Sequence, residues 1–500
     1  MDSFSKSTSG FDHWVRNHYQ HVDENIEIAD LRSSGEGRAL RATGDIKKDT
    51  VLFRLARDHI INVRTAALGK LKLSNIEVLE SLNQWEALIL CLGYEMLLGE
   101  ESQWSSYLQV LPEKFNSLMF WSDDELAMLK PSNVLTRIGR DQAERMHARL
   151  VPDMCVRLGS QKLADFLTLE KFHMVASIIM SYSFDVDDPE DDDVDEEEEE
   201  VNEFLAEEHD GLKFDGYLKS MVPLADTLNS NTNLVNANLS YENDVLVMTA
   251  TKDIKKGEQI FNIYGELPNS EILRKYGYVE VPASKYDFAE LSLSVIKQTF
   301  VGKYLSQFDN EVRESLFDKV VAFVGESEYL EETLEDQEGG IVLDAYEVFN
   351  DADVLPELVL LIQILTTVYE SFESDAKWAK KLTKSRSELD AFVNRCILKS
   401  FQLLEKTMIT KNCVINLHQC VQQRIAEYGE AKNYEIPETA GELSRSQMAA
   451  IVLKCEIVCL QTVLQKFPAK LEQIDDSKLL KNVLKRKSDS EEKKSKKRKA

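Results

Sequence analysis

A short segment of this sequence occurs twice, and the two copies lie far apart in the chain. ATGDIKK begins at Ala42 and leads to Phe53, and ATKDIKK begins at Ala250 and leads to Phe261. Each copy has strand-like residues on both sides of a polar DIKK turn. Hairpin connections favour such turn residues in general, so the match alone is a weak signal. We interpret the two copies as the two ends of one small β domain that a long insertion separates.

The segments around the two copies predict how the protein is divided. Residues 11–22 fit a short amphipathic helix, and IEIADL, RALRAT and TVLFRL fit strands, so residues 1–60 are predicted to be the N-terminal part of a β-rich core. Residues 61–209 have apolar residues at helical spacing and predict a helical insertion. Its end, residues 185–210, has too few apolar residues to fold and is predicted to be a disordered acidic loop. Residues 210–285 return to strand patterns and complete the core.

After Pro282 the pattern becomes helical again and predicts an all-helical domain over residues 286–480. In one of its segments, Ser444 and Gln447 have the spacing of a capping box. The Cys and His residues of this region do not complete a four-ligand set, so they are interpreted as packing residues and no metal site is predicted. The expected fold class is α+β, with a β-rich core split by a helical insertion and followed by a helical domain.

The net charge of −28 is unevenly distributed along the sequence. Of the 16 residues 185–200, 13 are acidic, whereas the last 16 residues carry nine Lys or Arg against three acids. An acidic run is usually a solvated spacer, although beside a site it could attract a basic protein. An evenly spread negative charge would disfavour direct binding of nucleic acid or of an anionic membrane, and we expect neither, although without the acidic run the folded part is only moderately acidic.

The basic tail, residues 481–500, contains two basic clusters with an acidic spacer between them. This arrangement resembles a bipartite nuclear import signal, whose partner would be a nuclear import receptor. The expected location is the nucleus, with the cytoplasm as a second location. A merely solubilising tail is the alternative.

Cysteine usage and hydropathy describe the expected environment. Seven cysteines at irregular spacing, without a signal peptide, indicate free thiols in a reducing compartment. No apolar run approaches the ~20 residues of a membrane span. The best candidate is the interrupted segment LPELVLLIQILTTVY, so we expect a soluble protein.

Polar residues interrupt the apolar, strand-like runs between residues 221 and 279, where a plain core would have more Val and Leu. Asp226, Asn229 and Tyr264 are among them. Far upstream, the GEGR segment that begins at Gly35 has two glycines, which permit positive φ and close approach of the backbone to a ligand. A lone GxG is more often a plain turn, so only the combination of segments predicts a site.

In this order, GEGR, ADTLNSNTNLVNANL, QIFNIYG and RKYGYV resemble the SET-domain lysine methyltransferases, in particular the group like the plant Rubisco large-subunit methyltransferase. SYSFDV, NIYGE, YGYVE and SKYDF are also similar to segments of fungal ribosomal lysine methyltransferases. The resemblance covers most of residues 25–480. It implies a SET core with a helical insertion, a helical substrate-binding domain, S-adenosylmethionine as cofactor and a lysine of a basic protein as methyl acceptor. A ribosomal protein of the large subunit is the favoured acceptor.

The resemblance also assigns roles to single residues. The positions that it places at the cofactor are Glu36, Gly37, Arg38, Ser181, Asn229, Tyr264 and Tyr278. The positions that it places at the substrate are Tyr182, Asp226, Tyr241 and Tyr276, although Asp226 fits a structural role at least as well. Tyr264 is the catalytic candidate, and Tyr278 is expected to pack on the adenine. The family usually has Asn-His where this protein has Asn229 and Ser230, so an imidazole at that position cannot be a required base.

Methyl transfer to lysine requires few protein groups. A sulfonium methyl is already electrophilic, so the enzyme must hold a neutral amine in line with it. Keeping a lysine of pKa ~10.4 neutral near pH 7.5 costs about 4 kcal/mol. An aromatic channel beside a cation reduces that cost, because it disfavours the charged ammonium. The Tyr264 hydroxyl and nearby carbonyl groups would orient the amine, and the proton can leave to water.

Two alternatives stay open at this point. The acceptor could be a lysine of a chromatin protein or a histidine instead of a ribosomal lysine. The protein could also be a non-catalytic scaffold that keeps the SET fold and binds a basic partner through its helical domain and acidic loop. The presence of Tyr264, Asn229 and the glycine pair argues against a scaffold.

Overall fold

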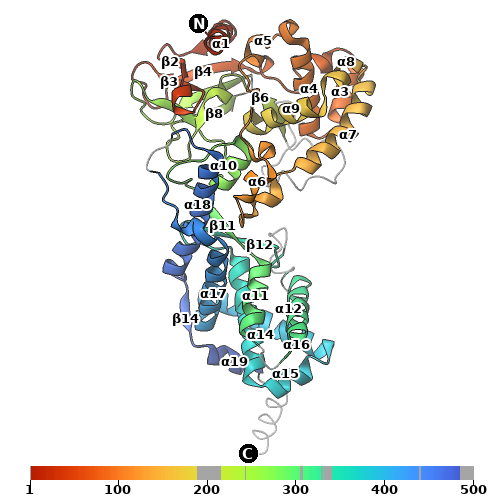
Figure 1. The fold of residues 1–500 in the computed structure, drawn as a ribbon, viewed down its shortest axis with the longest axis vertical. Helices are drawn as coiled ribbons and strands as arrows, with labels where there is room; N and C mark the ends of the chain where they lie inside the picture. Colours follow the sequence, from red (N-terminus) through yellow and green to blue (C-terminus); the bar gives the residue numbers. More distant parts are fainter. Residues whose placement is uncertain are drawn as a thin grey trace, which may run out of the picture. The chain divides into compact units, whose positions relative to one another are not determined.

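The computed structural model describes residues 2–188, 216–242, 244–304, 308–327, 330, 340–437 and 441–484. Most of the predicted acidic loop and the last 16 residues of the predicted basic tail lie outside these ranges. The described residues form two compact units (Figure 1). The first draws on residues 1–127, 134–285 and 437–448, and the second on residues 128–133, 286–436 and 449–500. Helices and strands occur in both, which confirms the α+β class.

Two small sheets of the first unit combine strands from both sides of the insertion. Their strand orders are β1-β4-β9-β8 and β2-β3-β10-β7. The strands are β1 (His21–Val22), β2 (Ile26–Asp30), β3 (Arg38–Ala42), β4 (Val51–Ala56), β7 (Asn229–Ser230), β8 (Ala237–Glu242), β9 (Val245–Ala250) and β10 (Gln259–Asn262). β4 pairs with β9 and β3 pairs with β10, both antiparallel. Each strand of the first sequence copy therefore pairs with a strand of the second copy.

The two DIKK turns contact each other directly. Ile46 and Ile254 exchange both backbone hydrogen bonds, at 2.8 and 2.9 Å, and both side chains are buried. Reciprocal ion pairs join Lys47 to Asp253 at 2.8 Å and Lys255 to Asp45 at 3.3 Å. These ion pairs are exposed and contribute little stability, so the backbone pairing and the two isoleucines hold the turns together. The repeat is therefore explained by mutual pairing of its two copies.

The helices of the first unit lie mainly between β4 and β6 in sequence. They are α1 (Ser3–His18), α2 (Ala67–Lys70), α3 (Leu73–Glu80), α4 (Gln84–Leu98), α5 (Ser105–Leu108), α6 (Asp123–Ala127), α7 (Arg140–Arg157), α8 (Gln161–Phe166), α9 (Leu169–Tyr182) and α10 (Asn269–Tyr276). α4 and α9 pack together (Figure 1), and the hairpin of β5 (Ser183–Asp187) and β6 (Tyr217–Met221) follows α9 in sequence. The side-chain oxygen of Asn83 caps α4 by accepting from the backbone NH of Glu86.

The first helix starts earlier than the apolar pattern predicts. α1 begins at Ser3, because the Asp2 carboxylate accepts a hydrogen bond from the backbone NH of Ser5 at 2.9 Å and caps the helix. Its first two turns are rich in Ser, Thr and Lys, which carry no apolar periodicity. The helix ends at His18, before β1, so the predicted end at residue 22 is wrong.

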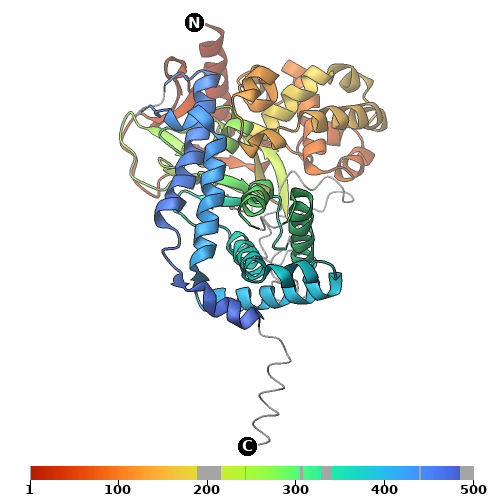
Figure 2. The ribbon, with the colours of Figure 1, turned by 60° about the horizontal axis from the view of Figure 1, so that its bottom comes forward.

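The second unit is mostly helical but includes short strands. Its elements are β11 (Phe288–Ser292), α11 (Leu293–Lys303), α12 (Asn310–Gly325), β12 (Ala345–Phe349), α14 (Pro356–Ser374), α15 (Ala376–Leu382), α16 (Arg386–Leu404), β13 (Met408–Thr410), α17 (Lys411–Glu427), most of α18 (Arg445–Lys466), β14 (Glu472–Ile474) and α19 (Asp476–Leu484). α14 packs against α16 and α17, and Figure 2 shows the long helix α18 in blue. The Ser444–Gln447 capping box is confirmed, with hydrogen bonds of 2.9 and 3.3 Å.

Two properties of the described residues bear on the expected environment. All seven cysteines are buried and free. α18 is long and apolar enough to cross a membrane by length and composition alone, but 61% of its apolar stretch is buried within the protein. A buried core helix can have the same length and composition, so these two properties of α18 are weak evidence for a membrane-spanning helix. The segment that the sequence offered as the best candidate lies in α14, whose side chains are also mostly buried.

Candidate active site

Asp226 lies in a short 3-10 helix (η6, Ala225–Thr227) between β6 and β7, and its carboxyl group is buried. The Tyr107 Oη donates a hydrogen bond to its Oδ2 at 2.5 Å. Burial raises the pKa of Asp226 to about 7, because desolvation disfavours the charged carboxylate. No Lys, Arg or His within the described ranges forms an ion pair with it. A cation from a ligand would therefore stabilise the ionised form.

Three phenols surround this carboxyl group. Burial, together with the nearby Asp226, raises the pKa of Tyr19 and Tyr107 well above the ordinary value, and that of Tyr182 to about 12. All three are therefore neutral at physiological pH. Leu224, just before Asp226, has a positive φ of 69°, a conformation that is strained for a residue with a side chain. The fold thus accepts local strain beside the buried carboxyl group.

Tyr264, Tyr276 and Tyr278 form a row of rings, which we call the tyrosine row. The ring centroids of Tyr264 and Tyr276 are 4.8 Å apart, and those of Tyr276 and Tyr278 are 6.4 Å apart. The Tyr264 Oη donates to the backbone carbonyl of Leu228 at 2.7 Å. Burial raises the pKa of Tyr264 far above its ordinary value, so its hydroxyl stays protonated. The row presents aromatic surface and a neutral hydroxyl next to Asp226.

Ser230, at the position where the resemblance predicts histidine, holds this row in place. Its Oγ accepts from the backbone NH of Tyr264 at 3.2 Å, and its backbone carbonyl accepts from the Tyr278 Oη at 3.2 Å. The residue is buried, with 9% of its surface exposed. Ser230 therefore has a structural role that requires no imidazole.

The GEGR loop is open on the side where a ligand would lie. Gly35 and Gly37 have φ of 81° and 68°, and a Cβ on Gly37 would meet no atom within 4 Å. Glu36 Oε2 accepts from Gln259 Nε2 at 3.0 Å, and Gln259 Oε1 accepts from Asn229 Nδ2 at 3.1 Å. Gln259 therefore links the predicted residues Glu36 and Asn229. No sequence pattern indicated Gln259, because the link depends on the pairing of β10 with both β3 and β7.

The guanidinium of Arg38 is bound to protein groups. It donates to Ser7 Oγ and Thr8 Oγ1, both at 2.9 Å, and to the backbone carbonyl of Val110 at 3.1 Å. It also lies 3.9 Å from the centre of the Phe4 ring. Any cofactor contact at Arg38 would therefore involve its backbone, while the guanidinium anchors α1 to β3.

Two other predicted residues lie at the edges of this region. Ser181 Oγ, on α9, donates to the backbone carbonyl of Lys275 at 2.7 Å and so connects α9 with α10. Tyr241 Oη, on β8, donates to the backbone carbonyl of Asp185 at 2.9 Å. Tyr241 therefore borders the start of the acidic run, whereas Ser181 supports the helix that leads into the tyrosine row.

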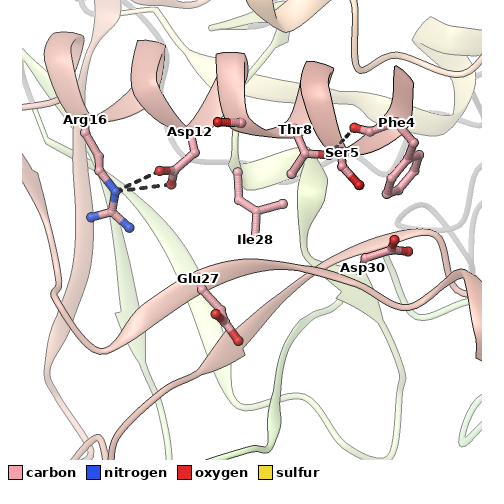
Figure 3. A pocket seen from close by; sticks show the side chains of 9 residues that line it. Phe4, Ser5, Thr8, Asp12, Arg16, Glu27, Ile28 and Asp30 are labelled. Carbon is pink, nitrogen blue, oxygen red and sulfur yellow. Dashed lines mark hydrogen bonds and ion pairs between the residues drawn. The ribbon is translucent and has the colours of Figure 1, made fainter. Parts of the chain in front are cut away.

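A surface pocket of about 320 Å³ lies between α1 and β2 (Figure 3), and its lining includes Phe4 and Thr8, which contact Arg38. Its three acidic residues are paired with arginines: Asp12 with Arg16, Glu27 with Arg41, and Asp30 with Arg32. Because its charges are neutralised and the tyrosine row does not line it, this pocket is not the candidate site.

The residues around Asp226 define the ligand that they can hold. Open backbone at Gly37 suits close approach, the tyrosine row suits flat and apolar groups, and Asp226 suits a positive charge. S-adenosylmethionine combines an adenine with a cationic sulfonium and an amino acid part. The residues present therefore fit this cofactor.

Comparisons with known proteins identify the family. The family model of the SET domain matches residues 37–265. Ribosomal lysine N-methyltransferase 4 of Saccharomyces cerevisiae is 39% identical over 515 residues, which cover 100% of this chain and 99% of that protein. N-lysine methyltransferase SETD6 of Rattus norvegicus is 25% identical, over 77% of this chain and 75% of that protein.

Solved structures show the same fold. Rubisco LSMT bound to AdoMet superposes with a TM-score of 0.57 at 18% identity, over 95% of each protein. Rubisco LSMT bound to sinefungin and monomethyllysine superposes with a TM-score of 0.58 at 17% identity, over 97% of this protein and 99% of that one. Because the yeast relative matches this protein from end to end, the chain belongs to the SET-domain family of S-adenosylmethionine-dependent protein-lysine methyltransferases.

Proposed function

We propose that the acceptor of this methyltransferase is a lysine of a ribosomal protein of the large subunit. The name of the yeast relative, a ribosomal lysine N-methyltransferase that matches the whole sequence at 39% identity, supports this acceptor. The charge of −28 also suits a basic protein substrate. The observation that supports methyl transfer itself is the tyrosine row beside a buried carboxyl group that forms no ion pair among the described residues.

The residues of the tyrosine row would prepare the substrate amine. S-adenosylmethionine, when bound, supplies an electrophilic methyl group. The rings of Tyr264 and Tyr276 exclude water from the amine, which lowers its pKa and increases its neutral fraction. Because the Tyr264 hydroxyl donates its hydrogen to the Leu228 carbonyl, its oxygen lone pairs are left to accept a hydrogen bond from the amine. Asp226 balances positive charge in this region, and water takes the proton that the amine loses.

The same proposal gives a function to the helical domain, the acidic run and the basic tail. Residues 286–480 would form the substrate-binding domain, and the acidic run that begins at Asp185 would attract the basic substrate. The basic clusters of residues 481–500 would bind a nuclear import receptor and place the enzyme in the nucleus. Ribosomal proteins pass through the nucleus before assembly, so this location would bring enzyme and substrate together.

The acceptor can be identified with labelled cofactor. We expect the full-length protein, incubated with methyl-labelled S-adenosylmethionine and an extract of cells that lack its gene, to label chiefly a large-subunit ribosomal protein. An extract of wild-type cells serves as the control, because its sites should already be methylated. A chromatin protein as the main labelled band would contradict the proposed acceptor and leave the methyltransferase assignment intact.

A further inference from the structure

The turn at Gly277, which joins Tyr276 to Tyr278, is held by residues 116–117, which are not part of the tyrosine row. Gly277 ends α10 with a φ of 78°, and a Cβ there would lie 2.6 Å from both the carbonyl carbon of Asn116 and the backbone nitrogen of Ser117. The backbone of residues 116–117 therefore lies directly on the glycine, and no larger residue fits between them. Asn116 Nδ2 also donates to the backbone carbonyl of Gly277 at 3.1 Å. One amide group thus fixes the peptide that precedes Tyr278.

Arg445 sets the orientation of the Asn116 amide. Its Nε donates to Asn116 Oδ1 at 2.9 Å. Because a guanidinium has only donors, it must face the amide oxygen, and the amide nitrogen is then directed at Gly277. Arg445 is itself fixed by an ion pair with Glu125 at 2.7 Å, and its guanidinium lies 5.6 Å from the centre of the Trp121 ring. The hydrogen bonds therefore run in one line, from Arg445 through Asn116 to Gly277.

We propose that Arg445 and Asn116 are positioning residues of the methyl transfer site, an inference that rests on the S-adenosylmethionine site described above. They fix the peptide between Gly277 and Tyr278, and with it the ring that is expected to pack on the adenine. Arg445 lies far beyond residues 37–265, which match the SET domain. A segment that follows most of the helical domain in sequence thereby controls cofactor affinity without contacting the cofactor.

A purely structural role would give a different result, and Arg140 provides the matched control. Arg140 donates to the backbone carbonyl of Met119 at 2.9 Å and of Trp121 at 2.8 Å. It therefore anchors the same loop as Arg445, but these bonds do not include Asn116. Loss of Arg140 should lower stability without changing the Gly277 turn.

The test uses four single variants and one double variant of the full-length protein: Arg445→Ala, Asn116→Ala, Arg445→Lys, Arg140→Ala and the Arg445→Ala/Asn116→Ala pair. Calorimetry gives the Kd for S-adenosylmethionine, and thermal unfolding gives the Tm. We expect Arg445→Ala and Asn116→Ala each to raise the Kd about tenfold, since each removes one bond of the line. Arg445→Lys keeps a cationic donor and should restore part of the affinity. The double variant should bind no more weakly than Asn116→Ala, because both changes act through Gly277.

Arg140→Ala should lower the Tm and leave the Kd unchanged. Equal Kd values for Arg445→Ala and Arg140→Ala would overturn the positioning role while leaving the cofactor site in place. If Arg445→Ala does not fold, the Kd values of Asn116→Ala and Arg445→Lys are compared with that of Arg140→Ala instead. A Kd equal to that of Arg140→Ala in both variants would then overturn the positioning role. Failure of the wild-type protein to bind S-adenosylmethionine would overturn the site itself and this inference with it.

Discussion

Replacing Tyr264 by Phe is expected to cut turnover about a hundredfold while S-adenosylmethionine binds with unchanged affinity. The ring, its packing on Tyr276 and the apolar surface remain in this variant. What disappears is the hydroxyl that donates to the Leu228 carbonyl at 2.7 Å and whose lone pairs would orient the amine. Single-turnover rates with saturating cofactor, together with calorimetric Kd values, measure both quantities.

Tyr346→Phe is the matched control for this variant. Tyr346 is fully buried, whereas Tyr264 is half-buried, and Tyr346 lies in the second unit. The Tyr346 hydroxyl donates to the backbone carbonyl of Ile341 at 2.9 Å and accepts from the backbone NH of Leu343 at 3.0 Å. Tyr264→Phe should cost about 1 kcal/mol of folding free energy, because it leaves the Leu228 carbonyl without its donor. Tyr346→Phe should cost at least as much, because the Ile341 carbonyl loses its donor and the Leu343 NH loses its acceptor. Wild-type turnover in Tyr264→Phe would show that the tyrosine assignment is wrong.

Replacing Asp226 by Asn is expected to stabilise the protein at pH 8 and to weaken its binding of S-adenosylmethionine. The pKa of Asp226 is about 7 in the folded protein, raised by burial from an ordinary value of 3.8. Folding stability is therefore lost as the pH rises from about 4 to about 7, because the unfolded state ionises first. The shift corresponds to about 4 kcal/mol at most. Asn carries no charge at any pH and its oxygen can still accept from Tyr107, so it avoids this loss.

Urea unfolding at pH 4 and pH 8 measures the difference in free energy of unfolding between Asp226→Asn and the wild type. This difference should be large at pH 8 and vanish near pH 4. Cofactor affinity should fall about tenfold, since the variant cannot balance the positive sulfonium. Glu456→Gln is the control, because burial raises the pKa of Glu456 to about 7 as well. Glu456 accepts from Tyr428 Oη at 2.6 Å and from Ser132 Oγ at 2.5 Å. That variant should likewise make folding stability less dependent on pH, without losing cofactor affinity. Equal affinity of Asp226→Asn and wild type would exclude an electrostatic role for Asp226.

Much of the fold could be predicted from the sequence, because it depends on short-range patterns. Strand alternation and the repeated DIKK turns indicated a split β core, and the mutual pairing of Ile46 and Ile254 explains why the repeat was informative. The capping box at Ser444 was also visible, since capping depends on residues three apart. The start of α1 was missed because its first turns have no apolar residues at helical spacing.

The site was predictable only in part, because its contacts join residues that are distant in sequence. The resemblance singled out Tyr264, Tyr276 and Tyr278, and the structure brings these into one row. It assigned no role to Tyr107, although this residue of the insertion donates to Asp226. It placed Arg38 alongside the cofactor but did not indicate that the guanidinium holds α1. Such partners depend on strand register and helix packing, which local patterns do not report.

The reaction proposed for this protein is methyl transfer to lysine at the tyrosine row beside Asp226. The most direct measurement is to incubate the full-length protein with methyl-labelled S-adenosylmethionine and an extract of cells that lack its gene, to hydrolyse the labelled protein, and to identify the labelled amino acid. We expect Nε-methyllysine as the labelled product with the wild-type enzyme and a strongly reduced amount with Tyr264→Phe. Label in methylhistidine would contradict lysine as the acceptor, and equal labelling by wild type and Tyr264→Phe would contradict the tyrosine row as the site of methyl transfer.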